Sequence, residues 1–138
     1  MTICFQDLRV GDTIPELVTP AIDRVQIVMF AGASGDFNPI HFDDERARAN
    51  GLPGVIAHGM LSMAILGRLL TDWVPITAVR SFSARFIAMV FPGDRLTCRG
   101  VVKTKTEQLG EQLVELDLSA VNQRCEPTLI GNAWVALR

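Results

Sequence analysis

The stretch HGMLSMAILGRLLTD, residues 58–72, decides the fold of this chain. Apolar or small residues occupy nearly every position in it, and only Ser62 and Arg68 interrupt them before its polar end. A helix that is apolar around almost its whole circumference is normally buried on most sides. The sequence therefore predicts one central helix from about His58 to Asp72, with the rest of the fold built around it.

Four predicted strands follow this helix. Apolar residues alternate with mostly polar neighbours over residues 82–90, and again over 95–106, 114–120 and 128–137. The connecting segments PGD, QLGEQ and NQRCEP are short, which implies an antiparallel sheet. We expect an α+β architecture in which the helix lies across the sheet. A single helix leaves apolar sheet area uncovered, so a dimer is expected.

The residues before the central helix predict smaller elements. Residues 11–21, GDTIPELVTPA, predict a short strand and a turn. Asp23 and Gln26 have the spacing of a capping box at the start of a helix, which Gly32 and Gly35 help to end. Its expected buried stripe is Ile27, Phe30 and Ala31, widened by Val28. Asp43 or Asp44 is expected to cap a second short helix that Gly51 ends.

The composition excludes several classes of protein. With 138 residues and 49% apolar residues, residues 1–138 are expected to form a single domain. A net charge of −2 gives no reason to expect nucleic-acid binding. Three widely spaced cysteines indicate reduced thiols, and no disulfide scaffold or zinc site. The longest apolar run, residues 54–67, is too short for a bilayer, and no signal peptide is evident, so we expect a cytoplasmic protein without membrane contact.

The segment SGDFNPIHFDD, residues 34–44, places Asp36, Asn38 and His41 on one loop. Taken alone, Asp-x-Asn-Pro is typical of an ordinary turn. A carboxylate and an imidazole held together can also move protons. The second block, Ala57-His58-Gly59-Met60, stands at the entry to the central helix.

Together the two blocks closely resemble the MaoC-like dehydratases, or (R)-specific enoyl-CoA hydratases (hydratase 2). The resemblance runs from Phe30 to Ile65 and includes the pattern D-x-N-x-x-H followed by AHGM. It implies a single hotdog fold, an antiparallel sheet wrapped around a long central helix. It also implies reversible addition of water to trans-2-enoyl thioesters, giving (R)-3-hydroxyacyl thioesters carried by CoA or acyl carrier protein. The resemblance further implies two hotdogs, either as a dimer or within one chain; 138 residues hold one, so a homodimer or heterodimer of hotdogs is expected.

The resemblance also implies roles for individual residues. Asp36 and His41 would be the acid/base pair and share one water molecule, while Asn38 ties the loop down. The Gly59 N–H, at the helix start, would polarise the thioester oxygen, because the first amides of a helix lack intrahelical partners. His58 would orient that helix start. No metal and no cofactor is expected, and Asp43, Asp44 and Glu45 are interpreted as a solvated helix start.

The sequence is also compatible with two functions other than that of a self-sufficient hydratase. One is a hotdog acyl-CoA thioesterase, which would release free thiol from a saturated substrate. The other is the catalytic subunit of a heteromeric 3-hydroxyacyl dehydratase that needs a second hotdog partner. The sequence does not indicate the acyl chain, the carrier, the direction of the reaction or which of Asp36 and His41 holds the proton at rest.

Overall fold

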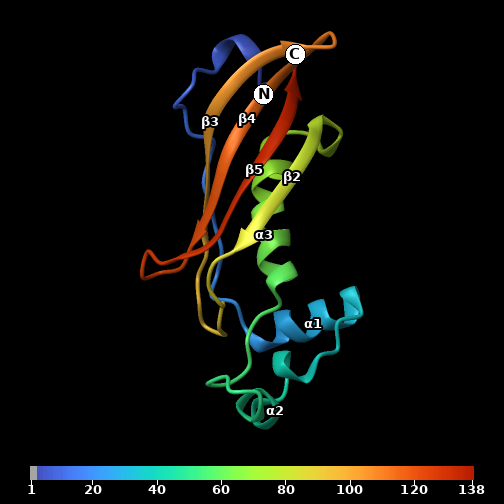
Figure 1. The fold of residues 1–138 in the computed structure, drawn as a ribbon, viewed down its shortest axis with the longest axis vertical. Coiled ribbons are helices and arrows are strands. Elements are labelled where there is room, and N and C mark those ends of the chain that lie inside the picture. The colour runs from blue at the N-terminus through green and yellow to red at the C-terminus, as the bar shows by residue number, and fades with distance from the viewer. Residues whose placement is uncertain (1–2) are drawn as a thin grey trace.

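A long helix and a curled five-stranded sheet dominate the computed structural model, which describes residues 3–138 (Figure 1). The α-helices are α1 (Arg24–Ser34), α2 (Asp44–Ala49) and α3 (Gly59–Trp73). The strands are β1 (Leu17–Val18), β2 (Val79–Phe86), β3 (Thr97–Gln108), β4 (Glu111–Val121) and β5 (Pro127–Leu137). Short 3₁₀ turns are η1 (Phe5–Asp7), η2 (Pro39–His41) and η3 (Ile76–Ala78).

The sheet is antiparallel throughout and has the order β1-β3-β4-β5-β2. Strand β2 follows α3 in the chain but pairs with the last strand, with Phe82 opposite Ala133. This crossover makes β2 an edge strand of the sheet. The predicted strand over residues 82–90 ends at Phe86, because the regular ladder with β5 breaks there: the N–H groups of Ile87 and Ala88 both donate to the Thr128 carbonyl of β5. The Val90 carbonyl then accepts from Ala57 instead.

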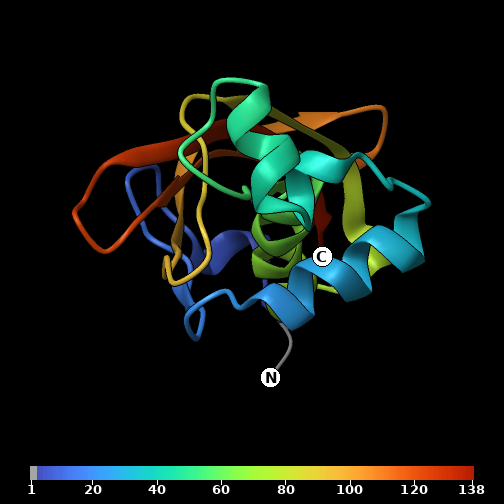
Figure 2. The same ribbon diagram turned by 90° about the horizontal axis from the view of Figure 1, so that it is seen from below.

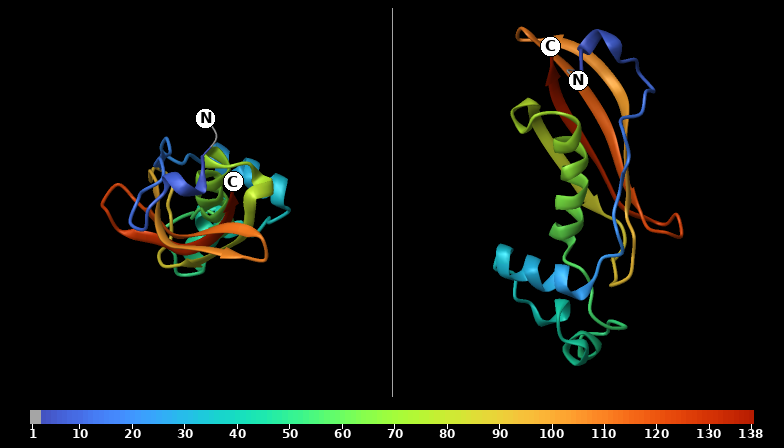
Figure 3. Two further views of the ribbon diagram at one scale, coloured as in Figure 1. Left: turned by 90° about the horizontal axis from the view of Figure 1, so that it is seen from above. Right: turned by 180° about the vertical axis from the view of Figure 1, so that it is seen from behind.

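Helix α3 lies in the concave face of the sheet, and seen from above the sheet curls around the helix (Figure 3). Leu66, Leu69 and Leu70 are fully buried on the helix, and they join the inward residues of the sheet in one core cluster. Along β4 these inward residues are Val114, Leu116, Leu118 and Ala120, at the period of two that the sequence predicts. The α+β hotdog architecture is thus confirmed.

Helices α1 and α2, with the segments that join them to α3, lie at the end of the molecule where α3 begins (Figure 2). The side chain of Asp23 caps α1 by accepting from the Gln26 N–H at 2.7 Å, as predicted. Gly35, at φ 73°, ends the helix in the left-handed region that glycine favours. Ile27 and Ala31 are buried as expected. The prediction for Val28 is wrong: it is 53% exposed, because the buried face of α1 is narrower than the apolar pattern.

One side of α3 remains open in the single chain. Met60, Ala64 and Arg68, spaced four residues apart, form an exposed ridge, so the helix is not buried on every side. This ridge and the unpaired edge of β2 leave surface for a further protein chain. Within residues 3–138, no helix has the length and apolar character needed to cross a bilayer.

Candidate active site

The loop between α1 and η2 is folded by its own side chains. The Asp36 carboxylate accepts from the Asn38 N–H at 3.2 Å, and the Asn38 side-chain oxygen accepts from the Ile40 N–H at 3.3 Å. Asn38 is thereby the N-cap of η2, with Pro39 in the first turn. These consecutive turns carry Asp36 and His41 to the same side of the loop. The loop-anchoring bond predicted for Asn38 is present.

Asp36 and His41 face each other across a short gap. Asp36 Oδ2 lies 3.8 Å from His41 Nε2, beyond the length of a direct hydrogen bond. His41 is 8% exposed, whereas the Asp36 side chain is 49% exposed. The other ring nitrogen of His41, Nδ1, lies 2.8 Å from the carbonyl oxygen of Ile56. A carbonyl only accepts, so Nδ1 carries the hydrogen and Nε2 of the neutral ring presents a lone pair to Asp36.

This arrangement suits a water molecule. In the form of the pair that has a carboxylate and a neutral imidazole, Asp36 Oδ2 and His41 Nε2 are both acceptors, so neither can satisfy the other. A water molecule has two O–H groups and can donate one to each. The two side chains are therefore close enough together to hold one water molecule between them and to accept a proton from it.

His58 lies against the pair from the side of α3. It is 1% exposed, and its ring stacks on that of His41 with centroids 3.8 Å apart and an interplanar angle of 26°. Its Nε2 lies 3.1 Å from the backbone carbonyl oxygen of Asp36. His58 is also the N-cap residue of α3, and its own carbonyl accepts from Leu61 and Ser62. The His58 side chain makes no capping hydrogen bond to α3, so its expected role in orienting the helix start stays a prediction. Its ring instead contacts the loop that carries Asp36 and His41.

The first two amides of α3 point out of the helix without a partner. Among residues 3–138, no hydrogen bond uses the N–H of Gly59 or Met60, whereas Leu61 and Ser62 are both bonded to His58. Both Gly59 and Met60 are exposed. The aligned peptide dipoles place about half a positive charge at such a helix start. Gly59 therefore offers a free donor directly after His58, whose ring stacks on His41, and its predicted use toward a thioester oxygen stays a prediction.

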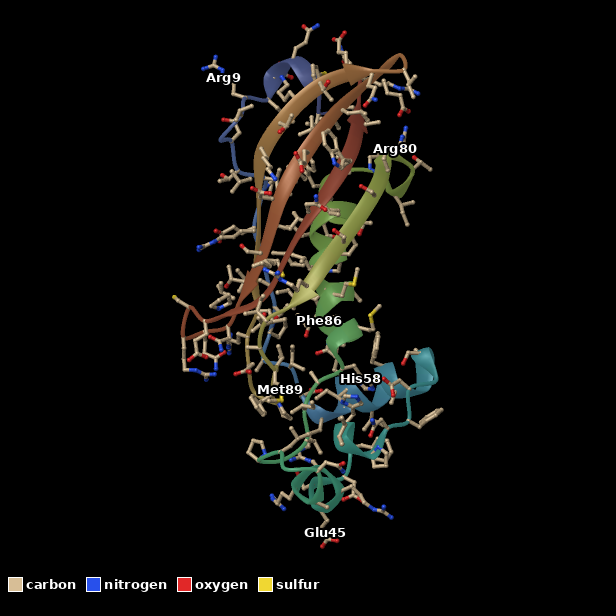
Figure 4. The ribbon with its side chains drawn as sticks, in the orientation of Figure 1. Arg9, Glu45, His58, Arg80, Phe86 and Met89 are labelled. Carbon is tan, nitrogen blue, oxygen red and sulfur yellow. The ribbon has the colours of Figure 1, made fainter. Side chains whose placement is uncertain are left out.

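Phe86, at the end of β2, closes the other side of this helix start (Figure 4). A Cβ at Gly59 would lie 3.1 Å from the Cε1 atom of the Phe86 ring. Met60, Phe86, Ile87 and Met89 are large apolar side chains that all remain substantially exposed. Phe86 and Met60 therefore form an exposed apolar wall at the free amides, and Ile87 and Met89 continue the chain from Phe86. The sequence did not identify Phe86 as a site residue, because its alternation marks it only as an inward strand position.

Asp44 holds the surrounding segments together. Its carboxylate accepts from the Val55 N–H at 3.0 Å and pairs with the Arg24 guanidinium at 2.9 Å. The hydrogen bond from Val55, supported by Arg24, lowers the pKa of Asp44 below its usual value. Asp44 thus joins α1, α2 and the segment that leads to His58. Its neighbour Asp43 is the cap of α2, so the two acidic residues have separate structural tasks.

The cluster of Asp36, His41 and His58 has donor types that bind transition metals, with ligand atoms within 4.8 Å of one another. The ring arrangement does not fit such an ion. Lone pairs of imidazole lie in the ring plane, and stacked rings point theirs side by side instead of at one point. One nitrogen of each histidine is also bonded to a backbone carbonyl. The absence of a metal in the reaction stays a prediction, which this geometry favours.

Comparisons with known proteins agree on one family. The family model described as "MaoC like domain" matches residues 8–123. The chain is 39% identical over 101 residues to "Enoyl-CoA hydratase 2, peroxisomal" of Arabidopsis thaliana, covering 71% of this chain and 30% of that protein. It is 35% identical over 89 residues to "3-hydroxyacyl-[acyl-carrier-protein] dehydratase, mitochondrial" of the same plant, covering 64% and 52%. The chain spans only about half, or much less, of the length of these curated relatives.

A solved structure of similar length agrees closely with the fold. It is the (R)-hydratase from A. caviae involved in PHA biosynthesis, which superposes with a TM-score of 0.84 at 28% identity. The match covers 96% of this chain and 99% of that one. The similarity therefore extends over the sheet, the central helix and the loop that carries the Asp36–His41 pair.

Proposed function

Because the chain belongs to the MaoC-like domain family, we propose that it is a hydro-lyase acting on acyl thioesters. It interconverts trans-2-enoyl thioesters and (R)-3-hydroxyacyl thioesters. The observation that carries this proposal is the Asp36–His41 pair, 3.8 Å apart, with His58 stacked on His41 and directly preceding the free amides of α3. The two relatives named as hydratases and the one named as a dehydratase support the same reaction class.

The proposed chemistry moves one proton through the pair. As the water oxygen attacks C3 of the enoyl group, a proton leaves it for the pair, and the pair then delivers a proton to C2. The pair ends each turnover in its starting state, so no further acid is required. We assign the removal of the proton to Asp36 and the orientation of the water to His41 Nε2. Because the two groups are coupled, the proton belongs to the pair more than to either residue.

The negative charge that develops on the thioester oxygen is met by the start of α3. The Gly59 N–H donates to this oxygen, and the helix dipole adds to the attraction. Removing one such donor from an acyl-transfer enzyme lowers kcat by about 10²–10³-fold, which sets the expected scale here. The apolar wall that includes Phe86 and Met89 would contact the acyl chain. No cofactor takes part in this scheme.

We further propose that residues 1–138 act as one hotdog domain paired with a second hotdog. A single core cluster runs from Ile14 to Val135, which supports one domain. The unpaired edge of β2 and the exposed ridge of α3 support a partner, because natural edge strands are usually covered. A homodimer and a heterodimer are distinguished by the molar mass of the purified chain and by its activity alone. We expect an active homodimer in the cytoplasm.

The test measures loss of the conjugated enoyl thioester in wild type, Asp36→Asn and His41→Gln. Asp36→Asn keeps the size of the side chain but removes the base, and His41→Gln keeps a polar side chain but removes the imidazole from the pair. We expect folded variants with turnover at least about a hundredfold lower, the usual contribution of a positioned acid or base. Asp72→Asn, an exposed carboxylate at the far end of α3, is the control and should match wild type. Near-normal turnover in either site variant would remove that residue from the mechanism.

The same assay tests the open alternatives. CoA and acyl-carrier-protein substrates are compared, because the two plant relatives are named for different carriers. Free thiol released from a saturated acyl-CoA would indicate a thioesterase instead. A folded chain that is inactive alone but active with a second hotdog protein would identify it as the catalytic subunit of a heteromer.

A further inference from the structure

His58 touches every part of the proposed catalytic apparatus without facing solvent. It directly precedes Gly59, its ring stacks on His41, and its Nε2 lies 3.1 Å from the carbonyl oxygen of Asp36. Figure 4 shows His58 immediately below the first turn of α3. Its second ring nitrogen, Nδ1, is buried and has no hydrogen-bond partner within residues 3–138. Every polar contact of the ring therefore goes to the Asp36 loop.

The hydrogen bonds fix opposite tautomers for the two rings. The carbonyl of Asp36 only accepts, so neutral His58 carries its hydrogen on Nε2. The carbonyl of Ile56 likewise fixes the hydrogen of His41 on Nδ1. The Ile56 carbonyl thus holds the His41 ring, the Asp36 carbonyl holds the His58 ring, and the two rings stack on each other. The Phe30 ring also packs against His58, with the two ring centroids 5.0 Å apart.

We propose that His58 is a positioning residue that sets the distance between Asp36 and His41; this inference rests on the proposed hydratase function. The Nε2–H bond fixes the backbone that carries the Asp36 carboxylate. The stack fixes the plane of the His41 ring, and hence the direction of its Nε2 lone pair. When His41 shares the proton during turnover, the face of a neutral imidazole lies against a cation, an arrangement that attracts as aromatic faces attract cations.

Two substitutions separate these contacts. His58→Phe keeps a flat ring against His41 but leaves the Asp36 carbonyl without its donor. His58→Gln keeps a donor near the place of Nε2 but removes the ring. Losing a buried hydrogen bond, or displacing a reacting group slightly, lowers a rate by about ten- to a hundredfold. We expect both variants to lose at least about tenfold in kcat while KM changes less than about threefold, because neither contact is made to the substrate.

A purely structural role would give a different result. It would lower the midpoint of urea unfolding but leave kcat of the folded protein within about twofold of wild type in both variants, and that result would overturn the inference. The comparison is made at a temperature at which circular dichroism shows each variant folded.

A second measurement does not depend on activity. The chain contains only two histidines, so a long-range ¹H–¹⁵N spectrum shows each imidazole separately. We expect one ring with its hydrogen on Nδ1 and one with its hydrogen on Nε2, and His58→Phe should remove only the second. Two rings of the same tautomer would overturn the inference even if no substrate is found. Opposite tautomers in a protein that hydrates no enoyl thioester would instead count against the proposed function alone.

Discussion

The glycine that begins α3 admits two physical explanations, and replacing it separates them. Gly59→Ala keeps the backbone N–H but adds a Cβ that would lie 3.1 Å from Cε1 and 3.3 Å from Cδ1 and Cζ of the Phe86 ring. On the first explanation, glycine lets the thioester oxygen approach the amide. On the second, glycine makes room for the Phe86 ring. We predict that the second explanation contributes substantially.

The magnitudes show why activity must be measured as well as stability. Overpacking of this kind costs about 1–3 kcal/mol in a closed core, and the half-exposed Phe86 ring can yield, so the lower end applies. Alanine regains up to about 1 kcal/mol of helix propensity over glycine. The net change in the free energy of unfolding is then only about 0–1 kcal/mol. A ring displaced from the site, in contrast, can lower kcat/KM by about ten- to a hundredfold.

The assay is a double-mutant cycle of wild type, Gly59→Ala, Phe86→Leu and the double variant. We expect Phe86→Leu to restore at least half of the lost activity, on a logarithmic scale, because leucine is smaller where the new methyl group lies. The matched control is Gly67→Ala, whose Cβ would lie 3.2 Å from the Phe82 ring, eight residues further along α3. This variant should repeat the small effect on stability without loss of activity.

Two results would refute the reasoning. If Phe86→Leu does not relieve the loss in Gly59→Ala, the glycine serves the approach of the thioester oxygen and the ring is incidental. If Gly67→Ala loses as much activity as Gly59→Ala, the effect comes from general disturbance of α3, and Phe86 has no special place in the site.

Three further predictions concern the surrounding structure. The pKa of Asp44 is lower in the folded protein than its ordinary value of 3.8, so the ionised carboxylate stabilises the fold above that pH and this contribution is lost as the pH falls through the folded-state pKa. Urea unfolding should therefore show that Asp44→Asn is less stable than wild type at pH 7. The difference in stability should shrink below about pH 4. Burial raises the pKa of the Cys98 thiol to about 11, so iodoacetamide and mass spectrometry should show exposed Cys125 labelled in the folded protein and Cys98 only after unfolding. Gly131→Ala would place a Cβ 2.2 Å from the Ser83 carbonyl oxygen, so it should separate β2 from β5 and lower the unfolding midpoint far more than Gly59→Ala does.

The sequence predicted the elements whose signals are local. The run from His58 to Asp72 is so apolar that it predicts a central helix whatever the order of the strands. The Asp23 side chain caps the start of α1, and the left-handed backbone of Gly35 ends the helix, both as predicted. The loop of Asp36 and His41 is likewise folded by bonds between near neighbours, so its spacing was informative.

The features that the sequence missed depend on contacts between distant segments. The pairing of β2 with β5 joins residues about fifty positions apart, and no local pattern encodes it. The alternation over 82–90 continued past Phe86, although the regular pairing with β5 ends there. Val28 has the same apolar character as its buried neighbours, and only the narrow contact of α1 with the rest of the molecule leaves it exposed.

The contact between α3 and β2 is nevertheless reflected in the sequence, in the spacing of two glycines and two phenylalanines. Gly59 and Gly67 lie eight residues apart on α3, a rise of about 12 Å. Phe86 and Phe82 lie four residues apart on β2, a distance of about 13 Å in an extended strand. The two glycines and the two rings therefore meet in register, each glycine under one ring. This match of spacings could have assigned β2 to α3, and Phe86 to the start of the helix, before any coordinates.

The same register connects the chemistry to the proposed partner. Phe86 ends the unpaired edge strand and also covers the helix start that would hold the thioester oxygen. In the single chain this region is open, since Asp36 is 49% and Phe86 51% exposed. Hydrogen bonds from amides stabilise a developing charge best where water is excluded. A second hotdog along β2 would therefore do more than cover an edge strand: it would exclude water from the proposed active site.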